Sequence, residues 1–167
     1  KGIDSEPVRV QTLYEFVRDQ VKHSFDIAEE KCVVTCKASE VLQYGQGICY
    51  AKSHLLAALL RSVGIPAGFC YQKLIFSAVK PDLVLHGLNA VYLKSLDKWF
   101  RLDARGNKPG VDAQFAVEQE RLAFPVRSEL GETDGWEVYA VPSRNVINAL
   151  NVSNNRAELV DNLPTEV

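Results

Sequence analysis

Apolar residues recur at helical spacing in two stretches of the first third of the chain. Residues 5–22 carry apolar positions every three to four residues, which predicts an amphipathic helix. A stronger pattern runs over 49–63, where the apolar positions predict the buried face of a second helix. Gly64 ends this helix as a C-cap, and Pro66 prevents its return. The apolar positions of the second helix are Ala51, Leu55, Leu56, Leu59, Leu60 and Val63.

The pattern changes after Gly64 to alternation and to runs of β-branched and aromatic residues, which are typical of strands. The predicted strands are 67–76, 86–94, 99–103 and 136–141. Shorter helices are predicted at 40–44 and 143–150, and from Asn151 onward we expect a polar, loosely held tail. Because helices precede strands, the order predicts an α+β fold in which the helix at 49–63 packs on an antiparallel sheet.

Length and composition fit one domain over residues 1–167. The chain has 167 residues, 47% of them hydrophobic and 24% charged, so it can bury a sizeable core without staples. The net charge of -2 argues against a nucleic-acid partner, which requires a basic excess. We also expect no membrane partner, since no apolar stretch is long enough to cross a bilayer.

The four cysteines do not form a familiar metal or disulfide pattern. Cys32 and Cys36 are spaced more widely than in a CxxC pair, and no second close Cys/His pair completes a four-ligand site, so we expect no metal and no cofactor. Free thiols favour a reducing compartment, and we expect a cytoplasmic protein. Methionine is absent, so the initiator is missing and we expect a processed or trimmed chain.

Cys49 is the one cysteine whose position suggests chemistry. It follows Gly45 and Gly47, which break the chain, and opens the strongest predicted helix. The partial positive charge of a helix N-terminus stabilises a thiolate, the form of cysteine that attacks carbonyl groups. The alternative is a small buried hydrophobe, which is also the expected role of the other three cysteines.

A base and an orienting group follow in the predicted hairpin. Of the three histidines, His23 is expected at a solvated helix end, and His54 lies about 140° around the helix from Cys49, too far to reach the thiol. His86 begins one strand of the hairpin and Asp103 ends the other. Antiparallel pairing brings these two ends together, so Asp103 can hold the imidazole. Taken alone, His86 also reads as an edge histidine and Asp103 as a turn residue.

At these residues the chain resembles the transglutaminase-like core family of the papain-like cysteine-enzyme superfamily. The resemblance covers about 38–110. It rests on the Gly-Gln-Gly-Ile-Cys motif at 45–49, the leucine-rich helix ending in Gly-Ile-Pro-Ala at 64–67, His86, and the Trp-Phe-Arg-Leu-Asp strand at 99–103. It departs from the family pattern at Leu88 and Ala90, where an aromatic residue and a glutamate are common, and at Ser53, where alanine is common.

The resemblance implies Cys49 as nucleophile, His86 as general base and acid, and Asp103 as orienter of His86. Such enzymes attack a peptide or protein carboxamide through a thioester, which water or an amine then resolves. The backbone N–H of Cys49 and a side-chain donor would hold the oxyanion. We assign that donor to Gln43, with Gln46 as its rival.

Three functions therefore remain open at this point. The first is a peptidase, amidase or transglutaminase, with hydrolysis favoured over crosslinking because water is always present. The second is a binding module that keeps the fold without catalysis. The third is acyl transfer from a carrier to an arylamine, although no carrier-binding motif is found. Trp99 and Tyr92 are candidates for the substrate cleft, or for ordinary strand packing.

Overall fold

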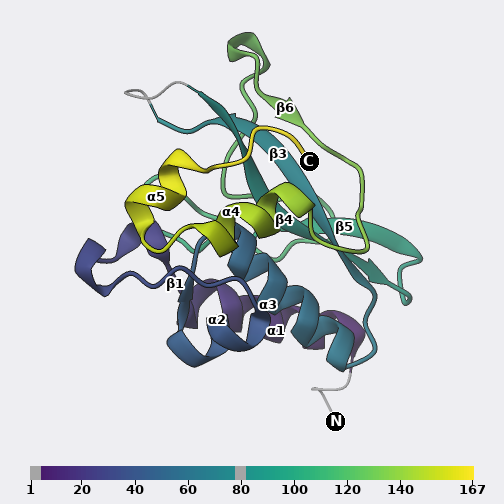
Figure 1. Ribbon diagram of the computed structural model, residues 1–167. Helices are drawn as coiled ribbons and strands as arrows, with labels where there is room; N and C mark the ends of the chain where they lie inside the picture. Colours follow the sequence, from purple (N-terminus) through teal and green to yellow (C-terminus); the bar gives the residue numbers. More distant parts are fainter. Residues whose placement is uncertain (1–4, 78–81) are drawn as a thin grey trace.

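The computed structural model describes residues 5–77 and 82–167 and shows an α+β fold, as predicted (Figure 1). Helices dominate the first third of the chain, and a four-stranded antiparallel sheet of order β5-β4-β3-β6 follows. The helices are α1 Glu6–Gln20, α2 Ala38–Tyr44, α3 Cys49–Ser62, α4 Arg144–Val152 and α5 Arg156–Asp161. The strands are β1 Lys22–His23, β2 Gln46–Gly47, β3 Ala67–Ile75, β4 Leu83–Leu93, β5 Lys98–Leu102 and β6 Thr133–Asp134. Short 3-10 turns are η1 Ser24–Asp26, η2 Glu29–Lys31 and η3 Ser128–Leu130.

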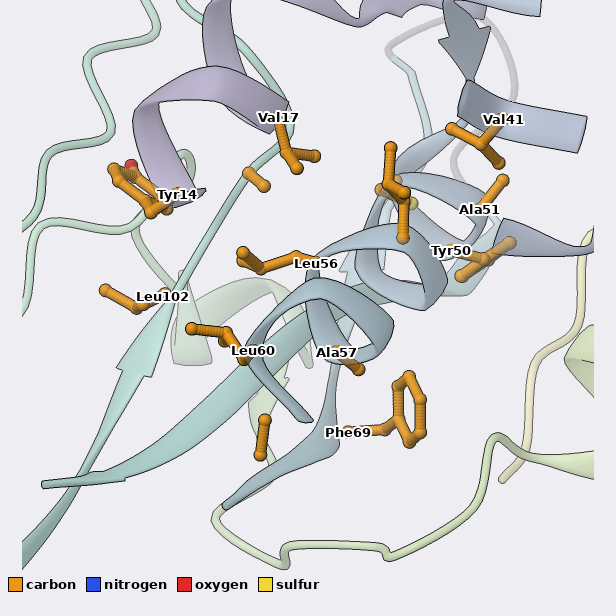
Figure 2. Packing of buried hydrophobic residues seen from close by; sticks show 14 of the residues in the cluster. Tyr14, Val17, Val41, Tyr50, Ala51, Leu56, Ala57, Leu60, Phe69 and Leu102 are labelled. Atoms are coloured by element: carbon orange, nitrogen blue, oxygen red, sulfur yellow. The ribbon is translucent and has the colours of Figure 1, made fainter. Parts of the chain in front are cut away.

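Helix α3 is the centre of the fold. It contacts α1 and α2 on one side and β3 and β4 on the other, so its first half is buried all round. Figure 2 shows Leu56 and Leu60 pointing toward Tyr14 of α1 and Leu102 of β5, while Ala57 points toward Phe69 of β3. Burial of these side chains ties the helix to both layers, since each fully buried apolar side chain contributes about 1.5–3 kcal/mol.

The ends of α3 are set by local sequence. Gly45 closes α2 with φ of 62°, which only glycine adopts freely, and the chain then forms the two-residue strand β2 before α3 begins. At the other end Gly64 has φ of 76°, so the predicted glycine stop is confirmed. Helix α3 thus runs from Cys49 to Ser62, between these two glycines, and its first residue is the one that the apolar pattern predicted.

The sheet is built around the β3–β4 and β4–β5 pairs. In β4–β5 the register sets Asn89 opposite Leu102, which places Asp103 just beyond the end of β5. Strand β4 starts at Leu83, three residues earlier than predicted, so His86 lies inside the strand. The predicted strand at 136–141 is wrong in position: β6 pairs with β3 at 133–134.

The reason lies in one side chain. Trp136 leaves the sheet and stacks on the Arg101 guanidinium, whose carbon lies 3.8 Å from the ring centre. Pairing with β3 resumes at a single residue, Tyr139, whose backbone exchanges hydrogen bonds of 2.9 Å with Phe69.

The stretch after Asn151 is not loosely held, which corrects the expectation from its polarity. Helix α5 buries Leu159, and the Pro164 carbonyl accepts a hydrogen bond of 2.8 Å from the Leu85 backbone on β4. Arg156 donates to the Ser24 carbonyl at 3.1 Å and the Ile27 carbonyl at 2.8 Å. A few long-range contacts thus fix a segment whose own composition is polar. Within the described residues, no helix is long and apolar enough to span a bilayer.

Candidate active site

Cys49 is the first residue of α3, so its side chain lies at the positive end of the helix dipole. Its side chain is buried, with 6% of its surface exposed, and it lines a cavity of about 820 Å³. Sequence placed the thiol at a helix start, and the structure adds that this start faces a cavity.

The start of α3 is pressed directly against β4. The Tyr50 hydroxyl donates to the Leu85 carbonyl, and the Asn89 amide donates to the Ser53 carbonyl at 3.0 Å. Between them lies Gly87, where an added Cβ would sit 2.7 Å from Tyr50 Cδ1 and 3.3 Å from its Cα. Only glycine permits this close approach, which brings the start of α3 to the level of His86.

His86 and Asp103 form a buried pair. The His86 Nε2 donates to Asp103 Oδ2 at 2.7 Å. Asp103 also accepts the backbone N–H groups of Arg105 and Ala123, each at 3.0 Å, so both carboxylate oxygens are fixed. Because Nε2 is committed to Asp103, the other ring nitrogen is left for Cys49, which also hydrogen-bonds the imidazole.

The charges of this pair support each other. Burial alone would lower the pKa of His86, but the Asp103 carboxylate and the Cys49 sulfur outweigh it and raise that pKa to about 10. Burial would raise the pKa of Asp103, yet the charge and hydrogen bond of His86, together with two backbone N–H groups, hold it below its usual value. The arrangement therefore favours an imidazolium beside an ionised carboxylate.

The cavity is largely apolar, and four charged residues take part in its lining. Arg105 and Lys108 both bind Asp26, while Arg127 binds Glu132. Such a cavity suits a ligand with a substantial apolar part. Besides those named, the lining includes Phe25, Ile48, Leu74, Phe76, Leu85, Phe124, Pro125, Leu130 and Leu163.

Three of the predicted residues meet, and three do not. Cys49 and His86 line one cavity, with Asp103 behind His86. Gln43 lies exposed on α2 and does not line the cavity, so we withdraw it as the oxyanion donor. Trp99 and Tyr92 face each other across the far end of the β4–β5 hairpin, with ring centres 5.6 Å apart, and do not line the cavity either.

Gln46, the rival to Gln43, is also held elsewhere. Its side chain accepts from the Val33 backbone at 2.9 Å and donates to the Lys31 carbonyl at 3.1 Å. Both the oxygen and the nitrogen of its side-chain amide are therefore bonded to the loop that precedes α2. The spacing of a glutamine before a cysteine does not by itself place it over the thiol.

All four cysteines are free thiols. Burial raises the pKa of Cys36, and it raises that of Cys70 to about 11. Neither residue lines the cavity with His86. Of the four thiols, Cys49 is therefore the one that lines the cavity with His86.

Sequence reasoning missed two buried polar residues, one lining the cavity and one behind it. His23, expected at a solvated helix end, is 6% exposed and lines the cavity. Lys52 is fully buried, and its ammonium donates to the carbonyls of Val21 at 2.5 Å, Arg105 at 3.0 Å and Arg18 at 3.2 Å. For Lys52 a signal existed, since it stands three residues before Leu55 and four before Leu56 and therefore lies on the apolar face of the helix. For His23 there was none, because its partners are distant in sequence.

Comparison with known proteins gives the family of the chain. The model of the transglutaminase-like superfamily matches residues 1–104, which includes α1 as well as the segment whose motifs carry the resemblance. No curated protein matches the chain significantly.

Two solved structures are similar in part. A candidate cysteine protease from Cytophaga hutchinsonii is 22% identical, with a TM-score of 0.44, over 57% of this chain and 30% of its own. A protein described as a TGase is 19% identical, with a TM-score of 0.49, over 78% of this chain and 33% of its own. The chain thus spans about a third of the length of either protein.

Proposed function

Because the chain belongs to the transglutaminase-like superfamily, we propose that it is a cysteine-dependent enzyme that cleaves carboxamide bonds of peptides or proteins through a thioester. The observation that carries this proposal is the buried His86–Asp103 pair, 2.7 Å between its bonded atoms, beside a thiol at a helix N-terminus. Nucleophile, base and orienting group within reach of one another are what nucleophilic catalysis requires.

The first half of the reaction forms the thioester. The Cys49 thiolate attacks the carboxamide carbon, a C–S bond forms, and the carbonyl oxygen becomes an oxyanion. The intermediate collapses with cleavage of the C–N bond, and the His86 imidazolium gives its proton to the departing nitrogen. Ammonia or an amine leaves, and the neutral imidazole stays bonded to Asp103.

The second half uses the same imidazole as a base. His86 takes a proton from water, whose oxygen attacks the thioester carbon. The C–S bond breaks, a carboxylic acid leaves, and Cys49 and His86 return to the thiolate and imidazolium. An amine in place of water would give a new amide. We favour hydrolysis, because water needs no binding site of its own.

A substrate screen tests this function. Peptide amides, glutamine-containing peptides and amine acceptors are offered to the wild-type chain, to Cys49→Ala and to Cys70→Ala. Cys70 is the matched control because it is buried and lies away from the cavity. We expect activity in the wild type and Cys70→Ala, lost in Cys49→Ala, with acid product exceeding transfer product. Activity that survives in Cys49→Ala would rule out the mechanism.

A further inference from the structure

The N-terminus of α3 holds donors that no side chain caps. Its N-cap residue is Ile48, whose side chain accepts no hydrogen bond, and the first helical bond of the backbone runs from Lys52 N to Ile48 O at 3.0 Å. The backbone N–H of Cys49 therefore has no acceptor within the helix. An oxyanion formed on a carbonyl attacked by Cys49 arises next to this N–H.

A second donor lines the same cavity from a different element. Strand β1 pairs in parallel with β2, and this sets His23 beside Gly47, two residues before Cys49. The His23 side chain is 6% exposed and lines the same cavity as Cys49 and His86. A two-residue strand thus brings this imidazole to the nucleophile segment.

The hydrogen bonds of His23 fix where its proton is. The Phe25 backbone N–H donates to His23 Nδ1 at 3.2 Å, so Nδ1 is the acceptor and the neutral ring carries its proton on Nε2. Burial, followed by the positive charges of Arg105 and Lys52, holds the pKa of His23 well below its usual value, against a weaker effect of Asp26. His23 is therefore a neutral donor near pH 7, and no described residue accepts its Nε2–H.

We propose that His23 is a further catalytic residue, whose Nε2–H binds the oxyanion together with the backbone N–H of Cys49. This inference rests on the proposed function. It replaces the glutamine expected from sequence, and it uses a donor for which the described residues offer no acceptor. Neutrality suits the role, since an imidazolium at this position would pair with the Cys49 thiolate and reduce its nucleophilicity.

Two reactions of the same thiol separate this role from a structural one. Iodoacetamide alkylates Cys49 by displacement at a saturated carbon, where no oxyanion develops. p-Nitrophenyl acetate acylates Cys49 through a tetrahedral oxyanion. Both rates are measured on the wild type, on His23→Phe and His23→Leu, which remove the donor, and on His23→Gln, which keeps one. His54→Phe is the control, because His54 is also buried but does not line the cavity.

We expect loss of the donor to slow acylation by about 10²–10³-fold, the effect of removing one oxyanion donor, and to leave alkylation within about twofold. His23→Gln is expected to restore part of the acylation rate. Using two non-donor variants keeps the test valid if one of them fails to fold.

The failures of the two proposals differ. If both reactions slow equally in His23→Phe and His23→Leu, or if neither slows, the role of His23 is overturned while the thiol chemistry stands. If wild-type Cys49 is alkylated but never acylated, the proposed function itself is overturned, and the role of His23 with it.

Discussion

His86 and His23 line the same cavity from two different elements, and their surroundings differ in one decisive respect. His86 on β4 has a buried carboxylate at 2.7 Å and the Cys49 sulfur beside it, which favours its charged form. His23 on β1 accepts a backbone N–H and faces the cations of Arg105 and Lys52, which favours its neutral form.

The comparison shows that burial alone does not decide what a histidine does. Both side chains are less than a tenth exposed. One lies beside negative charge and is suited to carry and return a proton, while the other lies beside positive charge and is suited only to donate a hydrogen bond. Lys52 links the segments that hold His23 and Asp103, because its ammonium binds both the Val21 carbonyl before β1 and the Arg105 carbonyl after Asp103.

The largest expected effects come from removing His86 or Asp103, the charged pair. His86→Ala removes the group that moves the proton, so we expect substrate turnover to fall by about 10²–10⁴-fold. Asp103→Ala removes only the orienting group and should cost less. Steady-state kcat/KM of the two variants, compared with wild type, checks this order. A larger loss for Asp103→Ala would mean that the carboxylate does more than hold the ring.

The next largest effect should come from removing the Lys52 ammonium, which links the segments that hold His23 and Asp103, and it should be a loss of stability. Lys52→Met removes the donor of three carbonyls, two of them in buried hydrogen bonds, so we expect the free energy of unfolding to fall by about 1–3 kcal/mol. Lys98→Met, on an exposed residue of β5, is the matched control and should change little. Urea unfolding measures both. If Lys52→Met and Lys98→Met lose equal stability, the buried Lys52 ammonium does not link the segments that hold His23 and Asp103.

Gly87 tests the contact that sets Cys49 against β4. In Gly87→Ala the new Cβ overlaps Tyr50, and we expect a loss of about 1–3 kcal/mol of stability and slower Cys49 acylation per folded molecule. Gly110→Ala is the comparison variant: its φ of 83° makes alanine strained there, whereas Gly87 has no such φ, but nothing lies within 4 Å of the added carbon, so acylation per folded molecule should stay unchanged. Unchanged acylation in folded Gly87→Ala would show that the approach of α3 to β4 is not critical.

The pH dependence of stability tests the charges of the His86–Asp103 pair. The raised pKa of His86 gives stability that is fully present below its unfolded value of 6.5 and is lost as pH rises toward about 10. The lowered pKa of Asp103 gives stability that is present above 3.8 and is lost as pH falls below it. The difference in unfolding free energy between wild type and His86→Gln, from urea unfolding, should be largest between pH 3.8 and pH 6.5 and smaller at pH 9. A difference independent of pH would contradict the charged pair.

Sequence predicted the parts of the site that depend on local pattern. Glycine breaks and an apolar stripe located α3 and its first residue, and the short β4–β5 turn brought His86 close to Asp103. His23 could not be found this way, because β1 pairs with a strand more than twenty residues away. The same holds for α5, whose anchoring depends on distant contacts of Leu159 and Arg156. Gln43 was placed by spacing alone, and it lies exposed and outside the cavity lining because spacing along the chain does not fix the direction of a side chain.

The most direct test of the central claim is the reactivity of the four thiols in one sample. The chain is treated with limiting iodoacetamide near neutral pH, and each cysteine is quantified by mass spectrometry over time, in wild type and in His86→Gln. A thiol paired with an imidazolium should make Cys49 react much faster than Cys32, Cys36 and Cys70, and this advantage should shrink in His86→Gln. Similar slow labelling of all four cysteines in the wild type would contradict the account.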